Sequence, residues 1–188
     1  MLSTAVAIGT AAAVLYAATR GPANLTYTKA PSGKDYLVQD LPDREEAAKR
    51  MESIQGKIGK LFTRYRDDPA TAAEPRVQMM LERFKPQNMC ESDMRDSTTS
   101  YSENKGDRIV VCLRQKTKGY PFVEENTVMF VMLHELAHLM TYSIGHTPEF
   151  WANFRRILND AMACGVYQNV NYNQTPVSYC GKIGRAHV

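Results

Sequence analysis

Histidine is scarce in this chain, and its few copies are unevenly placed. Only four occur among 188 residues, at positions 134, 138, 146 and 187. The last belongs to the C-terminal stretch IGRAHV, residues 183–188, which matches one reading-frame translation of a common sequencing-library adapter and which we interpret as non-native. The three remaining histidines fall within 13 residues of sequence. We therefore expect them to act together.

The chain also lacks a concentration of charge, an internal repeat and a low-complexity tract. Its formal net charge is only +3, and its basic residues are dispersed, which gives little support for a nucleic-acid-binding surface. A length of 188 residues and a hydrophobic content of 44% are typical of one globular domain with its own core.

Cysteine is sparse as well, and its four copies show no CxxC spacing, which argues against a second zinc site. They are Cys90, Cys112, Cys164 and Cys180. In an oxidising compartment they could form two disulfides in three pairings, whereas in the cytosol all four should be thiols.

Charge is absent from residues 2–19, LSTAVAIGTAAAVLYAAT. The run is just long enough to span a bilayer, and we predict a membrane anchor or signal segment over residues 1–20. If it is a single-pass anchor, the basic residues that follow it place the domain in the cytosol. A cleaved signal peptide, which would make the protein secreted or luminal, lacks the usual basic residue before the apolar run. An Ala-rich soluble helix is the third interpretation.

The rest of the chain predicts an α+β domain over residues 43–182, joined to the N-terminal segment by a proline-containing linker at residues 21–42. Apolar residues at intervals of three and four predict an amphipathic helix over 43–66. The other expected elements are a short helix through 77–84, two strands around a turn within 98–115, a buried helix from about 126 to 143, and a helix that starts at 147–149.

The motif HELAH, residues 134–138, places two imidazoles on one face of the buried helix. Residues four apart lie one above the other, so His134 and His138 can bind one metal ion, while Glu135 is displaced around the helix. In the HExxH arrangement this glutamate is a base and not a ligand. Buried imidazoles and a buried carboxylate need partners, and a metal ion satisfies them together.

A hydrolytic zinc site needs three protein ligands and one open position, and we predict His146 as the third ligand. It follows Gly145, where the chain can reverse after the helix. Zinc lowers the pKa of water toward about 7, and Glu135 would take the proton during attack on a carbonyl and pass it to the leaving amine.

Two further parts of the site are expected on less direct grounds. The strand around residues 109–113 could hold an extended peptide by edge pairing. Candidate stabilisers of the oxyanion are Tyr142, Tyr172 and Tyr179.

Together HELAH, the glycine-histidine pair, the PEFW helix and the upstream KGDRIVVCLR strand resemble the WLM metalloproteases, which are related to the SprT/Spartan group. The resemblance covers about residues 43–181 and is most specific over 106–151. It implies a compact zincin-type α+β fold, zinc on His134, His138 and His146, and Glu135 as catalytic acid and base. It also implies nucleic acid as a partner, since relatives of this family degrade DNA–protein crosslinks.

Seven residues separate His138 from His146, where the yeast-type WLM pattern has five. We interpret the two extra residues as a continuation of the helix beyond Met140.

The sequence thus predicts a zinc-dependent metalloendopeptidase that acts on a protein or peptide substrate. One alternative is a binding or structural module that uses zinc only for stability, or whose histidines are core residues without a metal. The other is a zinc amide hydrolase with a non-protein substrate.

Overall fold

The computed structural model describes residues 24–95 and 98–184. Its strands are β1 (Leu25–Lys29), β2 (Asp35–Gln39), β3 (Met89–Glu91), β4 (Tyr101–Glu103), β5 (Arg108–Val111), β6 (Val177–Tyr179) and β7 (Lys182–Gly184). Its helices are α2 (Arg44–Asp67), α3 (Pro69–Ala72), α4 (Pro75–Arg83), the 3₁₀ helix η1 (Pro86–Asn88), α5 (Glu125–Met140) and α6 (Pro148–Ala163). The predicted α+β class is confirmed.

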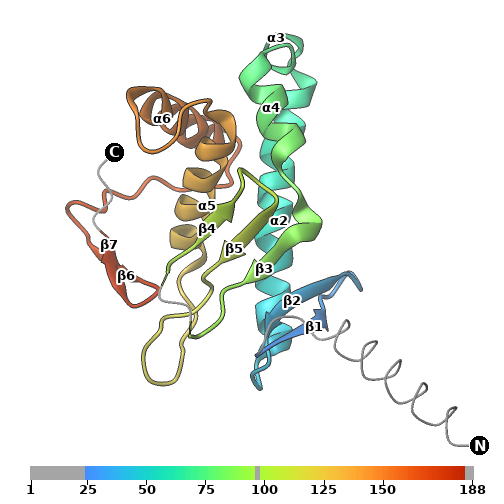
Figure 1. Cartoon of the computed structure of the whole chain (residues 1–188), viewed down its shortest axis with the longest axis vertical. Coiled ribbons are helices and arrows are strands. Elements are labelled where there is room, and N and C mark those ends of the chain that lie inside the picture. The colour runs from blue at the N-terminus through green and yellow to red at the C-terminus, as the bar shows by residue number, and fades with distance from the viewer. Residues whose placement is uncertain (1–23, 96–97, 185–188) are drawn as a thin grey trace, which may run out of the picture.

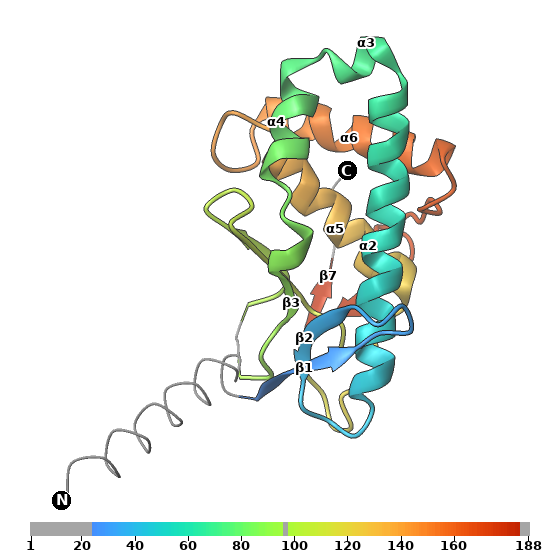
Figure 2. The same cartoon turned by 90° about the vertical axis from the view of Figure 1, so that its right-hand side faces the viewer.

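Five strands form one sheet in the order β1-β2-β3-β5-β4, and β6 and β7 form a separate hairpin. The central pairs β2–β3 and β3–β5 are parallel, whereas the outer pairs β1–β2 and β4–β5 are antiparallel. Helices α2 and α5 lie behind the sheet in Figure 1, and the quarter turn of Figure 2 shows both on that same side. The hydrophobic core contains side chains from the sheet and from both of these helices.

Helix α2 confirms the spacing argument. Its buried side chains all belong to one stripe, in which apolar residues recur at intervals of three and four; they are Ala47, Ala48, Met51, Ile54, Ile58, Leu61, Phe62 and Tyr65. The predicted pair of strands around a turn is also present as β4 and β5, which meet in antiparallel register.

Residues 21–42 differ from the expected linker, because β1 and β2 lie within them and pair with each other, and β2 also pairs with β3. Pro31 lies in the turn between the two strands, and Pro42 lies between β2 and α2. Proline is tolerated at strand ends, so the same prolines that suggested a tether fit a hairpin equally well.

The prediction of a single-pass membrane protein is corrected by the structure. Within residues 24–95 and 98–184, no helix combines the length and the apolar character that crossing a bilayer requires. The segment on which that prediction rested, residues 2–19, lies outside the described residues, as do positions 185–188 of the C-terminal stretch interpreted as non-native.

Candidate metal centre

The buried helix α5 supplies two of the three clustered histidines. Glu124 caps its first turn, where the carboxylate accepts a hydrogen bond from the Thr127 N–H at 2.9 Å. Apart from Glu135, ten side chains of α5 are buried, and they lie on nearly all sides of the helix, so it forms part of the core. His134 and His138 are partly buried and lie one turn apart, with their rings 4.9 Å apart between centroids.

The third histidine comes from the segment that joins α5 to α6. Gly145 has φ of +83°, in the left-handed region that favours glycine, and it reverses the chain just before His146. Thr147 then caps α6 by accepting a hydrogen bond from the Phe150 N–H, as the Thr-Pro-Glu sequence predicts. The exposed His146 ring is thereby turned back toward α5.

The three rings converge through their Nε2 atoms. The Nε2 atom of His134 lies 3.2 Å from that of His138 and 3.1 Å from that of His146, and the possible ligand atoms all lie within 4.8 Å of one another. Two imidazole nitrogens on a tetrahedral zinc ion, with bonds of about 2.0–2.1 Å, are separated by about 3.3 Å. The donor set therefore fits a zinc ion, with a fourth position left for another ligand.

Phe150 forms an apolar wall common to all three imidazoles. Its ring centroid lies 4.8 Å from that of His134, 4.4 Å from His138 and 4.7 Å from His146, and the side chain is fully buried. Burial, reinforced by the neighbouring imidazoles, lowers the pKa of His134 to about 3. Burial also lowers the pKa of His138 to about 4, with contributions from His146 and Lys105. Both rings are thus neutral at pH 7, which is the form that binds metal ions.

Glu135 lies beside the cluster but within the protein, where only 6% of its surface is exposed. Burial raises the pKa of its carboxyl group to about 8, and a hydrogen bond from the Ser102 backbone offsets part of the rise. A carboxyl group poised near neutral pH can both accept and deliver a proton. Ser102 lies on β4, so this strand and not only the helix defines the surroundings of Glu135.

The structure corrects the predicted peptide-binding strand. Strand β5 pairs with β3 on one side and with β4 on the other, so its backbone groups are already used within the sheet. Strands β1 and β4 form the two edges of the five-stranded sheet, and β4 is the edge beside Glu135. The chain order suggested β5, but the edge position could be read only from the three-dimensional pairing.

The three candidate tyrosines occupy different surroundings. Tyr142 lies in the segment between α5 and α6 and is 56% exposed. Tyr172 is buried against Phe130, with the ring centroids 4.8 Å apart. Tyr179 is buried too; burial, together with the charge of Glu135, raises the pKa of its hydroxyl group. Tyr179 is therefore near Glu135, whereas Tyr142 is the candidate that solvent can reach.

The cysteines also separate into two kinds. Cys112, just after β5, forms a disulfide with Cys180, which attaches the β6–β7 hairpin to the end of the sheet. Cys90 and Cys164 are free thiols, and Cys90 is buried. The sequence left the pairing open, since it depends on which segments meet in the fold.

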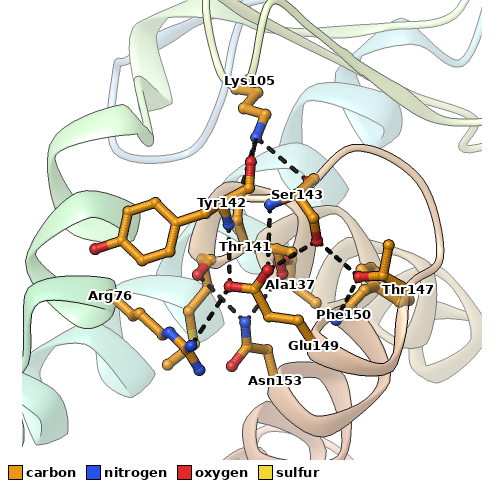
Figure 3. A network of polar contacts seen from close by, with 11 residues as sticks. Arg76, Lys105, Ala137, Thr141, Tyr142, Ser143, Thr147, Glu149, Phe150 and Asn153 are labelled. Carbon is orange, nitrogen blue, oxygen red and sulfur yellow. Dashed lines mark hydrogen bonds and ion pairs between the residues drawn. The ribbon is translucent and has the colours of Figure 1, made fainter.

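Sequence reasoning missed a group of residues that hold the segment before His146. Figure 3 shows Lys105 and Glu149 on two sides of Tyr142 and Ser143, and dashed lines mark their contacts with this segment. Lys105 was assigned only to a turn, and Glu149 only to the first turn of a helix. Nothing in their local sequence indicates that they meet across the site.

Comparison with known proteins finds one matching family, uncharacterised viral relatives and a solved structure of similar fold. The family model of the WLM domain matches residues 69–178. The uncharacterised protein R325 of Acanthamoeba polyphaga mimivirus is 29% identical over 186 residues, which cover 97% of this chain and 94% of that protein. The uncharacterised protein 136R of Invertebrate iridescent virus 6 is 32% identical over 80 residues, or 42% of this chain and 44% of that protein. A solved structure of a Wss1 mutant from Saccharomyces cerevisiae is similar in fold, with a TM-score of 0.50 and 21% identity over 67% of this chain and 86% of that one.

Proposed function

Because the chain belongs to the WLM-domain family, which suggests a metalloprotease-type function, we propose that it is a zinc-dependent endopeptidase. The observation that carries the proposal is the convergence of three imidazole groups beside a buried glutamate. His134, His138 and His146 would hold the metal ion, and Glu135 would act as the acid and base.

Zinc, when bound at such a site, supplies Lewis-acid chemistry that lowers the pKa of water and polarises a carbonyl group. The carboxylate of Glu135 accepts a proton as water attacks the peptide carbonyl carbon, and then delivers that proton to the leaving amine. Because burial raises its pKa, Glu135 holds the proton readily between the two steps. His134 and His138 stay neutral in both steps, since burial lowers the pKa of each ring.

An extended peptide would bind along β4. No other described strand pairs with the outer side of β4, so an extended peptide could add there as a further strand without requiring a particular side chain. Its residues, Tyr101–Glu103, are partly exposed, and the hydrogen bond from the Ser102 backbone to Glu135 brings the strand to the catalytic group. This geometry favours peptides over small amides, because the binding energy would come from a run of main-chain contacts.

The first test compares metal content and proteolysis in the full chain, in Glu135→Gln and in His146→Ala. Near one zinc ion per wild-type chain is expected, and His146→Ala should bind zinc more weakly. Glu135→Gln should retain zinc while its rate of cleavage of an unfolded protein substrate falls by at least about 100-fold, the lower range for removal of a general acid or base. Glu45→Gln, whose side chain is 70% exposed at the surface, is the matched control and should cleave at the wild-type rate.

The possible results separate the proposal from its alternatives. Zinc binding without proteolysis, and without any effect of Glu135→Gln beyond stability, would indicate a structural module. Hydrolysis of small amides but not of proteins would indicate a non-protein substrate. Failure of the wild type to bind zinc would refute the proposed metal centre. Nucleic acid as a cofactor of cleavage is proposed by family resemblance alone, and salt-insensitive cleavage that DNA does not stimulate would exclude it.

A further inference from the structure

His146, the third candidate ligand, lies in a segment that is neither helix nor strand. Helix α5 ends at Met140 and α6 begins at Pro148, so His146 lies in the loop of residues 141–147, which we call the ligand loop. The predicted continuation of α5 to about Ser143 is wrong, and the extra residues before His146 belong to this loop. His134 and His138 are fixed by a buried helix, whereas His146 depends on whatever orders the ligand loop.

Lys105 binds the ligand loop from the side of the sheet. Its Nζ atom donates hydrogen bonds to the carbonyl oxygens of Thr141 at 3.0 Å, Tyr142 at 2.8 Å and Ser143 at 3.5 Å (Figure 3). A lysine ammonium group has three N–H donors, so these carbonyls use all of them. Lys105 therefore has no donor left for a reacting carbonyl, and its contacts indicate a role in holding the chain.

Glu149, in the first turn of α6, binds the same segment through its N–H groups. Its carboxylate accepts hydrogen bonds from the Tyr142 N–H and the Ser143 N–H, each at 3.2 Å, and from the Ser143 hydroxyl group at 2.8 Å (Figure 3). Arg76 on α4 lies 3.6 Å from this carboxylate and has its guanidinium group 5.9 Å from the centre of the Tyr142 ring. The carbonyl groups of Tyr142 and Ser143 are thus bound by the positive charge of Lys105, and their N–H groups by the negative charge of Glu149.

The turn that carries Lys105 is itself fixed against the helices. Lys105 and Gly106 both have positive φ, of 54° and 112°. A Cβ atom at Gly106 would lie 2.2 Å from the Arg83 carbonyl oxygen, so the turn packs directly on the end of α4. The Arg83 side chain in turn donates to the Leu139 carbonyl oxygen at 3.0 Å. Lys105 is therefore held at the end of α5 by a closely packed turn, unlike a side chain on a free surface loop.

We propose that Lys105 and Glu149 are positioning residues that pre-order the ligand loop, so that His146 completes the metal centre. The inference rests on the proposed zinc site and extends it to the groups that orient its least constrained ligand. Without them, ordering of the loop would have to accompany metal binding, and that entropy cost would reduce affinity. Glu149 needs no contact with the metal ion for this effect.

Pre-ordering of the loop and electrostatic repulsion predict opposite changes in zinc affinity when the charge of Lys105 is removed, so a measurement of that affinity distinguishes them. The ammonium group acts on His138 as a nearby positive charge, and by Coulomb repulsion it disfavours a cation at the site. If this repulsion dominated, removal of the charge would tighten zinc binding. If pre-ordering dominates, removal weakens zinc binding.

The experiment measures zinc affinity of the full chain by competition with a chromophoric chelator, for Lys105→Met, Lys105→Arg and Glu149→Gln. Affinity should fall by about 10-fold to 100-fold in Lys105→Met, the range for groups that orient metal ligands, and should recover at least partly in Lys105→Arg. Glu149→Gln keeps the side-chain shape and should also weaken binding. Lys60→Met, on the exposed face of α2, is the matched control and should bind zinc like the wild type.

The visible spectrum of bound Co²⁺ supplies a readout that a general loss of stability would not change. At saturating cobalt, the spectrum of Lys105→Met should move toward that of His146→Ala. Zinc affinity in both Lys105→Met and Glu149→Gln within twofold of the wild type, or tighter binding by Lys105→Met, would overturn the inference while leaving the metal centre intact. A wild type that binds no zinc, or a His146→Ala variant that binds as tightly as the wild type, would overturn both.

Discussion

Replacement of Arg114 by methionine should destabilise the fold in a way that depends on pH. Arg114 is 3% exposed, and its Nε atom lies 3.0 Å from an oxygen of Glu91, whose side chain is completely buried. The other Glu91 oxygen accepts a hydrogen bond from the Gln39 N–H at 2.8 Å. Methionine retains most of the aliphatic stem but leaves this carboxylate without a cation.

The size of the effect follows from the least costly response of the carboxyl group. Burial already raises the pKa of Glu91, while Gln39 and Arg114 oppose the rise. Without Arg114 the folded state can take up a proton instead of keeping an unpaired buried charge. Relative to an unfolded glutamate of pKa 4.5, this costs at most about 3.4 kcal/mol at pH 7 but at most about 0.7 kcal/mol at pH 5, at about 1.36 kcal/mol for each pH unit, and the raised pKa in the wild type reduces the difference. We discount the pair with Asp43, because that side chain is half exposed.

In the variant, the pKa of the Glu91 carboxyl group in the folded state lies above its value in the unfolded state, and this decides how stability changes with pH. Its favourable contribution is complete below pH 4.5 and is lost as pH rises, so the variant should approach the wild type in acid. Urea denaturation in the presence of a chelator, at pH 5 and pH 7, measures the difference in the free energy of unfolding. Arg44→Met removes a surface arginine that is 46% exposed and should leave the free energy of unfolding nearly unchanged at both pH values. A loss for Arg114→Met below about 1 kcal/mol at pH 7, or one of equal size at both pH values, would refute the reasoning.

Two further predictions concern the metal-free site and the disulfide. The metal-free protein should lose about 3 kcal/mol of unfolding free energy between pH 7 and pH 4, because unfolded His134 and His138 take up protons that the folded rings, with pKa of about 3 and 4, do not; this value is halved for partial exposure. Urea denaturation at a series of pH values gives the free energy of unfolding, which should fall more steeply between pH 7 and pH 4 in the wild type than in a variant with both histidines replaced by glutamine. An equal fall in the two proteins would contradict the prediction. Cys180→Ser opens the bond to Cys112, which closes a loop across a sequence separation of 68, and should lower stability by about 2–4 kcal/mol in thermal denaturation. Unchanged stability would mean that the bond does not constrain the unfolded chain.

Local sequence was sufficient for the elements whose signals are repeated within one segment. The spacing of apolar residues identified α2 almost to its ends, and Thr147, Pro148 and Glu149 marked the start of α6. Both are determined by contacts between near neighbours: one buried stripe in the first case, and one capped turn in the second. HELAH likewise specified two imidazoles on one face, because four residues make about one turn of a helix.

The end of α5 was not predictable in this way. The groups that satisfy its last carbonyls come from other elements: Arg83 donates to the Leu139 oxygen, and Asn153 donates to the Met140 oxygen at 3.3 Å. With these partners available, the chain leaves the helix at Thr141, earlier than its own sequence indicates.

By itself, then, the sequence determined the chemistry available to this protein: three histidines, one glutamate and the helical spacing that pairs two of them. Only the tertiary structure decided how that chemistry is assembled. It brought the His146 imidazole to the others, made β4 rather than β5 the edge strand, and joined Cys112 to Cys180. Helical periodicity is encoded between residues a few positions apart, whereas sheet order, loop support and disulfide pairing depend on segments that meet only after the core has formed.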